Sequence, residues 1–503
     1  MRILFSKSIN LILGILMLLI VILCMCGTGA EYAYKKVFMF SNIVYALLGV
    51  ICFALIGSIA YKIGVFLEKS KKTSIIMFFF SVLFFLGLVG LTYHYYFKTG
   101  WDAQMVEWAA KAIADKDWEN IQNRYFSYYP NNVFLTFVFS CVVKLGMLLG
   151  VDNYYFCIII FQCALFAITG YLLYASARWC VDGRIAFAIW MMYVLMIGLS
   201  PWVVIPYSDA TGLLFPTLLI YIYIRICRGK NSMWWIGCFT FFSYLGYRIK
   251  PQIAIVAIAV LLVTFFSVQK DCFLEKKKLL WRVIACASGL VLGMLVVNAG
   301  VRATHMNIEK ELTFGLPHYI MMGLNEEYGG VINIVDQDFS MRFSTREERN
   351  EANLQVAGER LEKLGIGGLL NLWKNKILTN FADGTFAWWQ EGNFYSQEMY
   401  EGNYQLRSVL TEFYYEGRPG HDWFKNFMQA LWMGTLSLSL TSTFIFRKQD
   451  GKKELDVLKL SLVGIIIFEM IFEARARYIF IYAPLFMFWA WMSWEKYIKR
   501  IGL

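Results

Sequence analysis

Two aspartates offer the clearest chemistry in this sequence. Asp102 lies in Thr-Gly-Trp-Asp-Ala just after an apolar stretch, and Asp209 lies in Pro-Tyr-Ser-Asp-Ala-Thr-Gly where a later apolar stretch ends. A carboxylate at such a point can simply be solvated. It can also take the proton of an attacking hydroxyl as a general base, or hold a cation that binds phosphate. Asp102 and Asp209 are therefore the candidate catalytic residues.

Four basic residues form a second candidate group. Arg248 and Lys250 lie in Gly-Tyr-Arg-Ile-Lys-Pro-Gln, and Arg475 and Arg477 lie in Phe-Glu-Ala-Arg-Ala-Arg-Tyr. Both pairs end apolar stretches on the predicted outer side of a membrane, where positive charge is disfavoured. Cationic side chains of this kind suit phosphate oxygens, so the four are expected to bind a phosphate. Snorkelling to the interface and pairing with Glu473 are the alternatives.

The composition sets the class of protein that must position these residues. Of 503 residues, 58% are hydrophobic and 17% are charged, whereas soluble domains carry about 25% charged residues. This indicates a polytopic membrane protein. The net charge of +11 is explained by basic cytoplasmic loops and requires no nucleic acid partner. The 11 cysteines show no paired CxxC spacing, so neither a disulfide framework nor a zinc site is indicated.

The hydropathy pattern predicts an all-α fold with about twelve transmembrane helices, since about 20 apolar residues cross a bilayer. The first apolar run has no small-residue cleavage site and is expected to be a retained helix. The crossings are expected at 9–26, 42–66, 74–93, 154–176, 185–204, 210–226, 233–247, 252–269, 282–302, 427–446, 457–472 and 478–494.

Charge predicts the orientation. With the N-terminus inside, every inner loop is basic, as the positive-inside rule requires. These loops are Glu68–Thr73, Arg178–Arg184, Arg225–Lys230, Lys270–Arg282, Arg447–Lys453 and Lys496–Arg500. The prediction is a multi-pass plasma-membrane protein with both termini cytoplasmic and the active site external. This orientation requires that the apolar stretch Val133–Leu149, which contains Lys144, does not cross the membrane. The stretch is expected to lie in the outer interface or to form a re-entrant segment.

Three regions follow from this topology. Residues 1–302 form the N-terminal transmembrane region with an external catalytic loop at 93–153, residues 303–426 form a large external region, and residues 427–503 hold the last crossings. In the large external region, Arg346–Leu364 has helical spacing, and Gly365 is expected to stop that helix. A small external α-rich subdomain is therefore expected.

The end of the large external region is apolar and aromatic. Gly367–Ile377 is predicted to be an amphipathic helix that lies on the membrane. An aromatic cluster follows it, and it is expected either to anchor the chain at the interface or to stack on a sugar or acceptor. Its members are Phe386, Trp388, Trp389, Phe394 and Tyr395.

The sequence resembles the GT-C membrane glycosyltransferases, which include protein O-mannosyltransferases, aminoarabinose transferases and oligosaccharyltransferases. The resemblance rests on Asp102 in the first large external loop, on Tyr128-Tyr129-Pro130-Asn131 after it, and on Asp209 after a later outward crossing. Two further stretches are similar to parts of Gram-positive membrane proteins of this type. They are Met321–Asn325 and the segment from Asp383-Gly384-Thr385-Phe386 to Glu391-Gly392.

The resemblance implies a reaction. Asp102 is expected to be the base that lets an external glycan, lipid or protein attack the sugar of a polyprenyl-phosphate donor, with inversion. Tyr129, Trp388 and Trp389 are expected to contact the sugar or acceptor. Asp209 has no neighbouring acid, so the sequence assigns no cofactor, and a divalent cation stays an open alternative.

Two other classes fit parts of the pattern. A polymerase or ligase of polyprenyl-linked polysaccharide would share the crossings, the external arginines and the large external region, but it would not need Asp102. A secondary transporter or lipid flippase would carry charges at the midplane and often paired repeats; the sequence has no internal symmetry and few charges within its apolar runs. No Walker A, GxSxG or dinucleotide motif is present.

Overall fold

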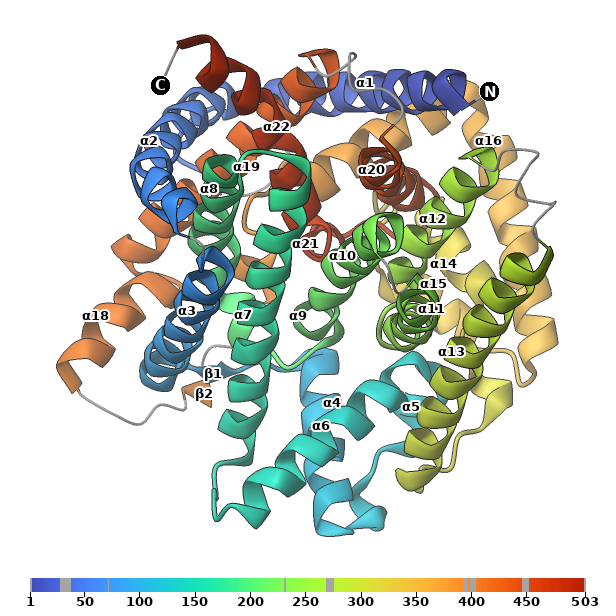
Figure 1. Cartoon of the computed structure of the whole chain (residues 1–503). Coiled ribbons are helices and arrows are strands. Elements are labelled where there is room, and N and C mark those ends of the chain that lie inside the picture. Colours follow the sequence, from blue (N-terminus) through green and yellow to red (C-terminus); the bar gives the residue numbers. More distant parts are fainter. Residues whose placement is uncertain are drawn as a thin grey trace.

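The computed structural model describes residues 2–27, 38–70, 72–229, 232–267, 276–391, 397–398, 404–445 and 452–501. Within these residues the regular structure is helical, apart from one antiparallel pair of two-residue strands, β1 (Phe97–Lys98) and β2 (Gln397–Glu398). Figure 1 shows the helices packed side by side around a central group. The predicted all-α class is confirmed.

Seven described helices are long and apolar enough to cross a membrane. They are Arg2–Cys26 (α1), Asn42–Leu67 (most of α2, Asn42–Lys69), Thr73–Tyr95 (α3), Asn131–Leu148 (α6), Tyr154–Cys180 (α7), Ser208–Arg228 (α9 and α10) and Lys277–Ala303 (most of α13, Lys276–Ala303). This supports a polytopic membrane protein, while the number twelve stays a prediction.

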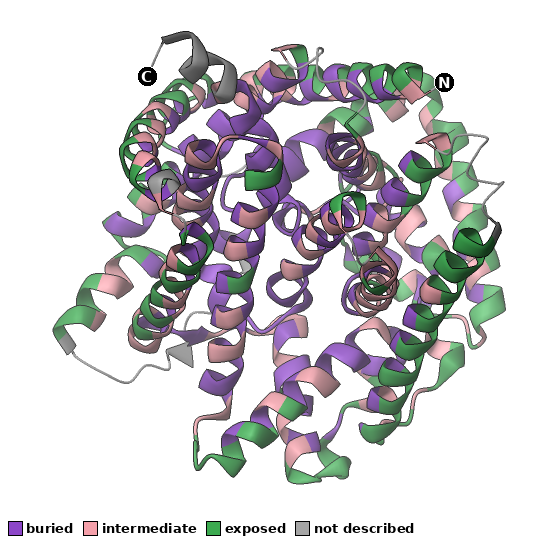
Figure 2. Ribbon diagram, viewed as in Figure 1, coloured by how far each residue is buried: buried purple, intermediate pink, exposed green. Residues whose placement is uncertain are grey.

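The outward faces of these helices are apolar. Leu295 of α13 and Leu47 of α2 are more than half exposed, and Figure 2 shows exposed residues along α2, α3 and α13 around a buried centre. In water such surfaces would be costly, whereas in a bilayer they contact lipid.

The later predicted crossings also form helices, with some interruptions. The predicted crossing at 185–204 is wrong as a single helix: α8 (Gly183–Tyr193) runs into a π turn, and a 3-10 turn at Pro201–Val204 follows. Proline lacks an N–H and disfavours helix at the residue before it. The remaining helices here are α9 (Ser208–Gly212), α10 (Leu214–Arg228), α11 (Ser232–Ile249), α12 (Ala254–Ser267), α19 (Pro419–Ile445), α20 (Lys453–Ile471), α21 (Arg477–Phe480) and α22 (Ala483–Ile501).

Three helices fill the predicted catalytic loop: α4 (Trp101–Asp115), α5 (Asn123–Tyr128) and α6 (Asn131–Leu148). α6 packs on α4 and runs obliquely to α7 (Figure 1). Its length and composition would also allow a crossing, so its predicted interfacial placement stays a prediction.

The described part of the 303–426 region is mainly helical, and strand β2 also lies in it. It contains α14 (Leu316–Gly323), α15 (Ile334–Met341), α16 (Arg346–Phe381), α17 (Trp388–Glu391) and α18 (Tyr404–Tyr414). Inside α16, Gly365 has φ 55° and ψ −168°, a conformation that glycine adopts easily. The predicted helix and its break at Gly365 are confirmed. In the second half of α16, Leu370 and Trp373, three residues apart, are both exposed, as the amphipathic pattern of Gly367–Ile377 predicts; its place on the membrane stays a prediction.

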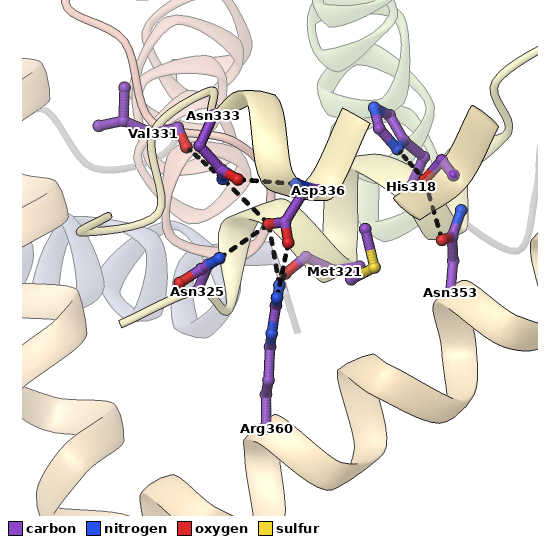
Figure 3. A network of polar contacts seen from close by, with 9 residues as sticks. His318, Met321, Asn325, Val331, Asn333, Asp336, Asn353 and Arg360 are labelled. Atoms are coloured by element: carbon purple, nitrogen blue, oxygen red, sulfur yellow. Dashed lines mark hydrogen bonds and ion pairs between the residues drawn. The ribbon is translucent and has the colours of Figure 1, made fainter. Parts of the chain in front are cut away.

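A polar network joins these helices. Figure 3 shows the Asp336 carboxylate facing Arg360 and two asparagines. Arg360 donates to both carboxylate oxygens at 2.6 and 3.0 Å, while Asn325 and Asn333 donate to Oδ2 at 2.9 and 3.0 Å. Burial opposes ionisation, but these hydrogen bonds lower the pKa of Asp336 below its usual value. α14, α15 and α16 are thereby tied together.

Some predictions fall beyond this description. Residues 270–275 of the basic loop Lys270–Arg282, most of Arg447–Lys453, and the aromatic residues Phe394 and Tyr395 lie outside the described residues.

Candidate active site

A buried ion pair lies at the centre of the candidate site. Lys250 Nζ donates to Asp209 Oδ1, and Arg477 Nε lies 4.0 Å from Asp209 Oδ2. Asp209 is fully buried on α9, Lys250 follows α11, and Arg477 opens α21. Because Pro251 disfavours helix at the residue before it, Lys250 is extended and turns away from α11. Three predicted site residues from three segments thus meet.

Arg477 is surrounded by aromatic rings. Its guanidinium carbon lies 4.9 Å from the centre of the Trp101 ring and 5.5 Å from those of Tyr207 and Tyr478. Lys250 Nζ lies 4.7 Å from the centre of the Tyr478 ring. Cations are attracted to ring faces at such distances, so the aromatic residues hold both cations in place beside Asp209.

Tyr207 connects Asp102 to this cluster. Its hydroxyl donates to Asp102 Oδ2 at 3.0 Å, and its ring meets Trp101 edge to face at 4.8 Å. Asp102 lies half-buried in the first turn of α4, where the helix dipole stabilises a negative charge. Figure 1 shows α9 and α21 near the middle of the molecule, with α4 below them in the view. The two predicted acids therefore belong to one assembly.

Trp101 has an unusual backbone. Its φ is 50°, a region that non-glycine residues seldom adopt. Trp101 begins α4 directly before Asp102, so the same turn presents the indole to Arg477 and the carboxylate to Tyr207. Such backbone outliers cluster at functional sites.

Tyrosines with partly exposed rings border Asp102. Tyr125 and Tyr129 have ring centres 5.3 Å apart. Asn132 donates to the Tyr125 hydroxyl at 2.7 Å, and Gln337 of α15 donates to the Tyr129 hydroxyl at 3.1 Å. Burial, followed by the negative charges of Asp102 and Glu473, raises the pKa of Tyr129 above its usual value. Tyr129 therefore stays a neutral phenol beside the carboxylate.

Two buried acids complete the cluster, and only one was noted in the sequence. Glu469 accepts a hydrogen bond from Gln252 Nε2 at 2.9 Å, and Glu473 lies one turn further along the chain. Glu469 and Glu473 are spaced i, i+4 at the end of an apolar stretch. This spacing is the sequence feature that identifies them as candidates, because ionisable residues in such stretches are usually functional. Trp101 and Tyr207 were missed although each lies within two residues of a predicted acid.

Three predicted residues are not brought to this cluster by any described contact. Arg248 is half-buried in the last turn of α11, and its Nε has no hydrogen-bond partner among the described residues. Trp388 is 1% exposed and packs on His421 and Phe424 of α19. Trp389 is also buried, with Lys425 Nζ 5.9 Å from its ring centre. The tryptophans pack between helices in this structure.

Arg475 lies close to the cluster. It precedes Arg477 by two residues, and its charge acts on the Tyr478 phenol. The segment from Glu473 to Arg477 therefore carries one acid and two cations at the end of α20.

A divalent cation does not fit the surroundings of Asp209. Its two carboxylate oxygens face Lys250 and Arg477, whose positive charges repel a metal ion. Among the described residues, no group of three or more histidine, cysteine, aspartate or glutamate side chains could hold a metal ion.

The helical fold, its apolar outer faces and the buried charged cluster define a polytopic integral membrane protein. Over residues 6–498 the chain matches the model of a family described as conserved hypothetical integral membrane protein, and it belongs to that family. No curated protein matches the chain.

Proposed function

We propose that this protein is a membrane glycosyltransferase that moves a sugar from a polyprenyl-phosphate donor to a glycan, lipid or protein acceptor at the cell envelope. One observation carries the proposal: a half-buried carboxylate, Asp102, and two buried cations, Lys250 and Arg477, belong to a single assembly joined through Tyr207. Sugar transfer from a phosphate needs both a base and a place for the leaving charge.

The proposed reaction is a single displacement. The acceptor oxygen attacks the anomeric carbon as the bond from that carbon to the phosphate oxygen breaks. Asp102 takes the acceptor's proton, while Tyr207 holds Oδ2 of the same carboxylate. The phosphate leaves with its charge beside Arg477 and Lys250. One displacement inverts the anomeric centre.

Asp209 has a different proposed role from Asp102. Its carboxylate is fully buried and is engaged by Lys250 and Arg477, so it orients the two cations and does not contact the acceptor. Because an uncompensated buried charge is costly, loss of Asp209, which leaves two cations unpaired, is expected to destabilise the fold more than loss of Arg477, which leaves Asp209 paired with Lys250. Tyr125 and Tyr129 border Asp102 and are the rings proposed to contact the sugar or acceptor.

The direct test is an assay with purified protein and a panel of polyprenyl-phosphate sugars. Consumption of one donor in the presence of an acceptor fraction from the cell envelope supports the proposal. If no donor on the panel is consumed by folded protein, a polymerase or a transporter becomes the better explanation.

One observation favours a transporter as the second candidate. α20 buries Asp456, Lys459 and Glu469 within an apolar helix; Lys459 Nζ lies 3.1 Å from Asp456 Oδ1, and Ser6 donates to that oxygen at 2.6 Å. Such charges often mark ion or substrate paths. Transport into proteoliposomes that is unchanged by Asp102→Asn would favour this second candidate.

A further inference from the structure

Lys376 is a fully buried lysine that has no part in the proposed reaction. It lies in the second half of α16 and is 0% exposed. Its ammonium group donates to three backbone carbonyl oxygens: Gly323 at 3.1 Å, Met470 at 3.0 Å, and Phe472. An ammonium has three N–H donors, so its hydrogen-bonding capacity is filled.

These carbonyls belong to the ends of two other helices. Gly323 is the last residue of α14, Met470 lies in the last turn of α20, and Phe472 caps α20. The last carbonyls of a helix have no partner within it and carry partial negative charge. One ammonium from α16 therefore caps the C-termini of α14 and α20 together.

The backbones at this junction are in close contact. Ala474 N donates to Gly330 O at 2.8 Å. A Cβ at Gly323 would lie 2.5 Å from the carbonyl oxygen of Ile471, and Gly330 has φ +76°. The end of α14 and the turn after it thus contact Ile471, Phe472 and Ala474, and this stretch leads directly into Arg475 and Arg477.

Lys376 is charged near neutral pH although it is buried. Burial lowers its pKa to about 8, an effect that the negative charges of Glu469 and Glu473 partly oppose. A buried ammonium is tolerated only when it is fully hydrogen-bonded or paired, and the carbonyl groups and the two glutamates meet that requirement.

We propose that Lys376 is a positioning residue: by capping α14 and α20 together, it fixes segment 472–477 and thereby the place of Arg477 beside Asp209 and Trp101. The expected effect of Lys376 on catalysis rests on the proposed function. The expected effect of Lys376 on the order of segment 472–477 does not rest on it, so an experiment can reject either claim without rejecting the other.

The test compares Lys376→Met with Lys374→Met, which removes an exposed lysine from the same helix. Amide hydrogen exchange reports on segment 472–477 without any assay of activity. We expect at least tenfold faster exchange at the Ala474 amide in Lys376→Met and wild-type exchange in Lys374→Met. Lys376→Arg, which keeps the charge, should restore part of the protection.

A second readout links the segment to the reaction. Loss of Arg477 placement should raise the KM for the polyprenyl-phosphate donor about tenfold, which is the effect of losing one charge-assisted hydrogen bond, and change kcat less. If Lys376→Met does not fold, the exchange and KM measurements are made on Lys376→Gln instead. The glutamine amide still donates hydrogen bonds but has no charge.

The outcomes separate the two proposals. Unchanged Ala474 protection in a folded Lys376→Met or Lys376→Gln protein overturns the positioning role. Lost protection together with a wild-type protein that consumes no donor supports the positioning role and rejects the proposed function. Lost protection with an unchanged donor KM overturns the link to Arg477.

Discussion

Tyr207 links the two predicted aspartates, whose surroundings differ. Its hydroxyl donates to Asp102, and its ring lies against Arg477, which in turn lies beside Asp209. Asp102 is half-buried at a helix start, whereas Asp209 is fully buried against two cations. The accessible carboxylate is therefore the one suited to meet an acceptor, and the buried one is suited to orient charge.

Asp102→Asn keeps the size of the side chain but removes its basicity. Positioned general-base catalysis contributes about 10²–10⁴-fold, so turnover should fall by that factor while donor binding is kept. The measurement is a transfer assay, with folding checked by chromatography and the product anomer read by NMR. Asp115→Asn, at the other end of α4, is the matched control and should keep its activity. Wild-type turnover of Asp102→Asn, or a product of retained configuration, would contradict this mechanism.

Arg477→Gln should weaken donor binding, because it removes a cation from the proposed phosphate site. Loss of a hydrogen bond to a charged group costs roughly 1.5–3 kcal/mol, or about tenfold to a hundredfold in affinity. Arg248→Gln is the informative control, because no described contact joins Arg248 to the cluster. Donor titration of both variants checks this. If Arg248→Gln weakens binding and Arg477→Gln does not, the phosphate site has been assigned to the wrong cations.

At the scale of elements, α14, α15 and α16 depend on buried polar groups. His318 of α14 is fully buried, stacks on Phe314 with ring centres 4.1 Å apart, and has its Nδ1 2.7 Å from Ser340 Oγ. Since Ser340 donates its hydroxyl hydrogen to Asn353 at 3.0 Å, His318 Nδ1 is the donor in this pair. His318 Nε2 has no partner among the described residues, so protonation there is costly.

Acid should therefore loosen these helices. Burial lowers the pKa of His318 from 6.5 to about 4, so between these values the unfolded chain binds a proton that the folded chain does not. Stability falls as pH falls through that window, by roughly 3 kcal/mol at most. Hydrogen exchange of α14–α16 between pH 7 and 4 measures it.

Two variants make this pH test specific. His318→Gln should remove most of the change over this window. His305→Asn should not, because His305 is exposed and asparagine tolerates its positive φ. The pKa of Asp336 is also lowered, so this carboxylate affects the pH dependence of stability only below its usual pKa of 3.8. A pH response that persists in His318→Gln would show that another group dominates.

At the scale of the whole molecule, apolar outer faces surround a core in which charged residues are paired. Lys250 with Asp209, Arg477 near Asp209, and Lys459 with Asp456 are all buried pairs. Burying an isolated charge is costly in protein or lipid, and pairing reduces that cost.

Cysteine labelling tests the predicted orientation. The positive-inside bias predicts that a cysteine at Glu351, in the first half of α16, reacts with a membrane-impermeant maleimide added to intact cells, and that one at Lys452, just before α20, does not. Both side chains are exposed, so access is decided by the membrane. The wild-type protein gives the background from its native cysteines. Reversed labelling would falsify the topology and would place Asp102 on the cytoplasmic side.

Local patterns in the sequence predict the class of protein and single out four charged residues that lie together in the structure. Long apolar runs predict membrane helices because the bilayer sets their length, and Gly365 breaks α16 because it adopts a positive φ. Asp102, Asp209, Lys250 and Arg477 were all found at the ends of apolar stretches, where charges are unusual, and the structure brings them into one cluster.

Contacts between distant segments decided what local patterns could not predict. Trp388 and Trp389 belong to an aromatic run that suits an interface or a sugar, but α19 packs over them and buries both rings. Lys376 resembles a solvated residue of an amphipathic helix, yet it is buried because helix ends from α14 and α20 supply three carbonyl groups. Which acid meets which cation depends on such packing, since a hydrogen bond requires atoms about 3 Å apart and sequence spacing does not specify that distance across helices.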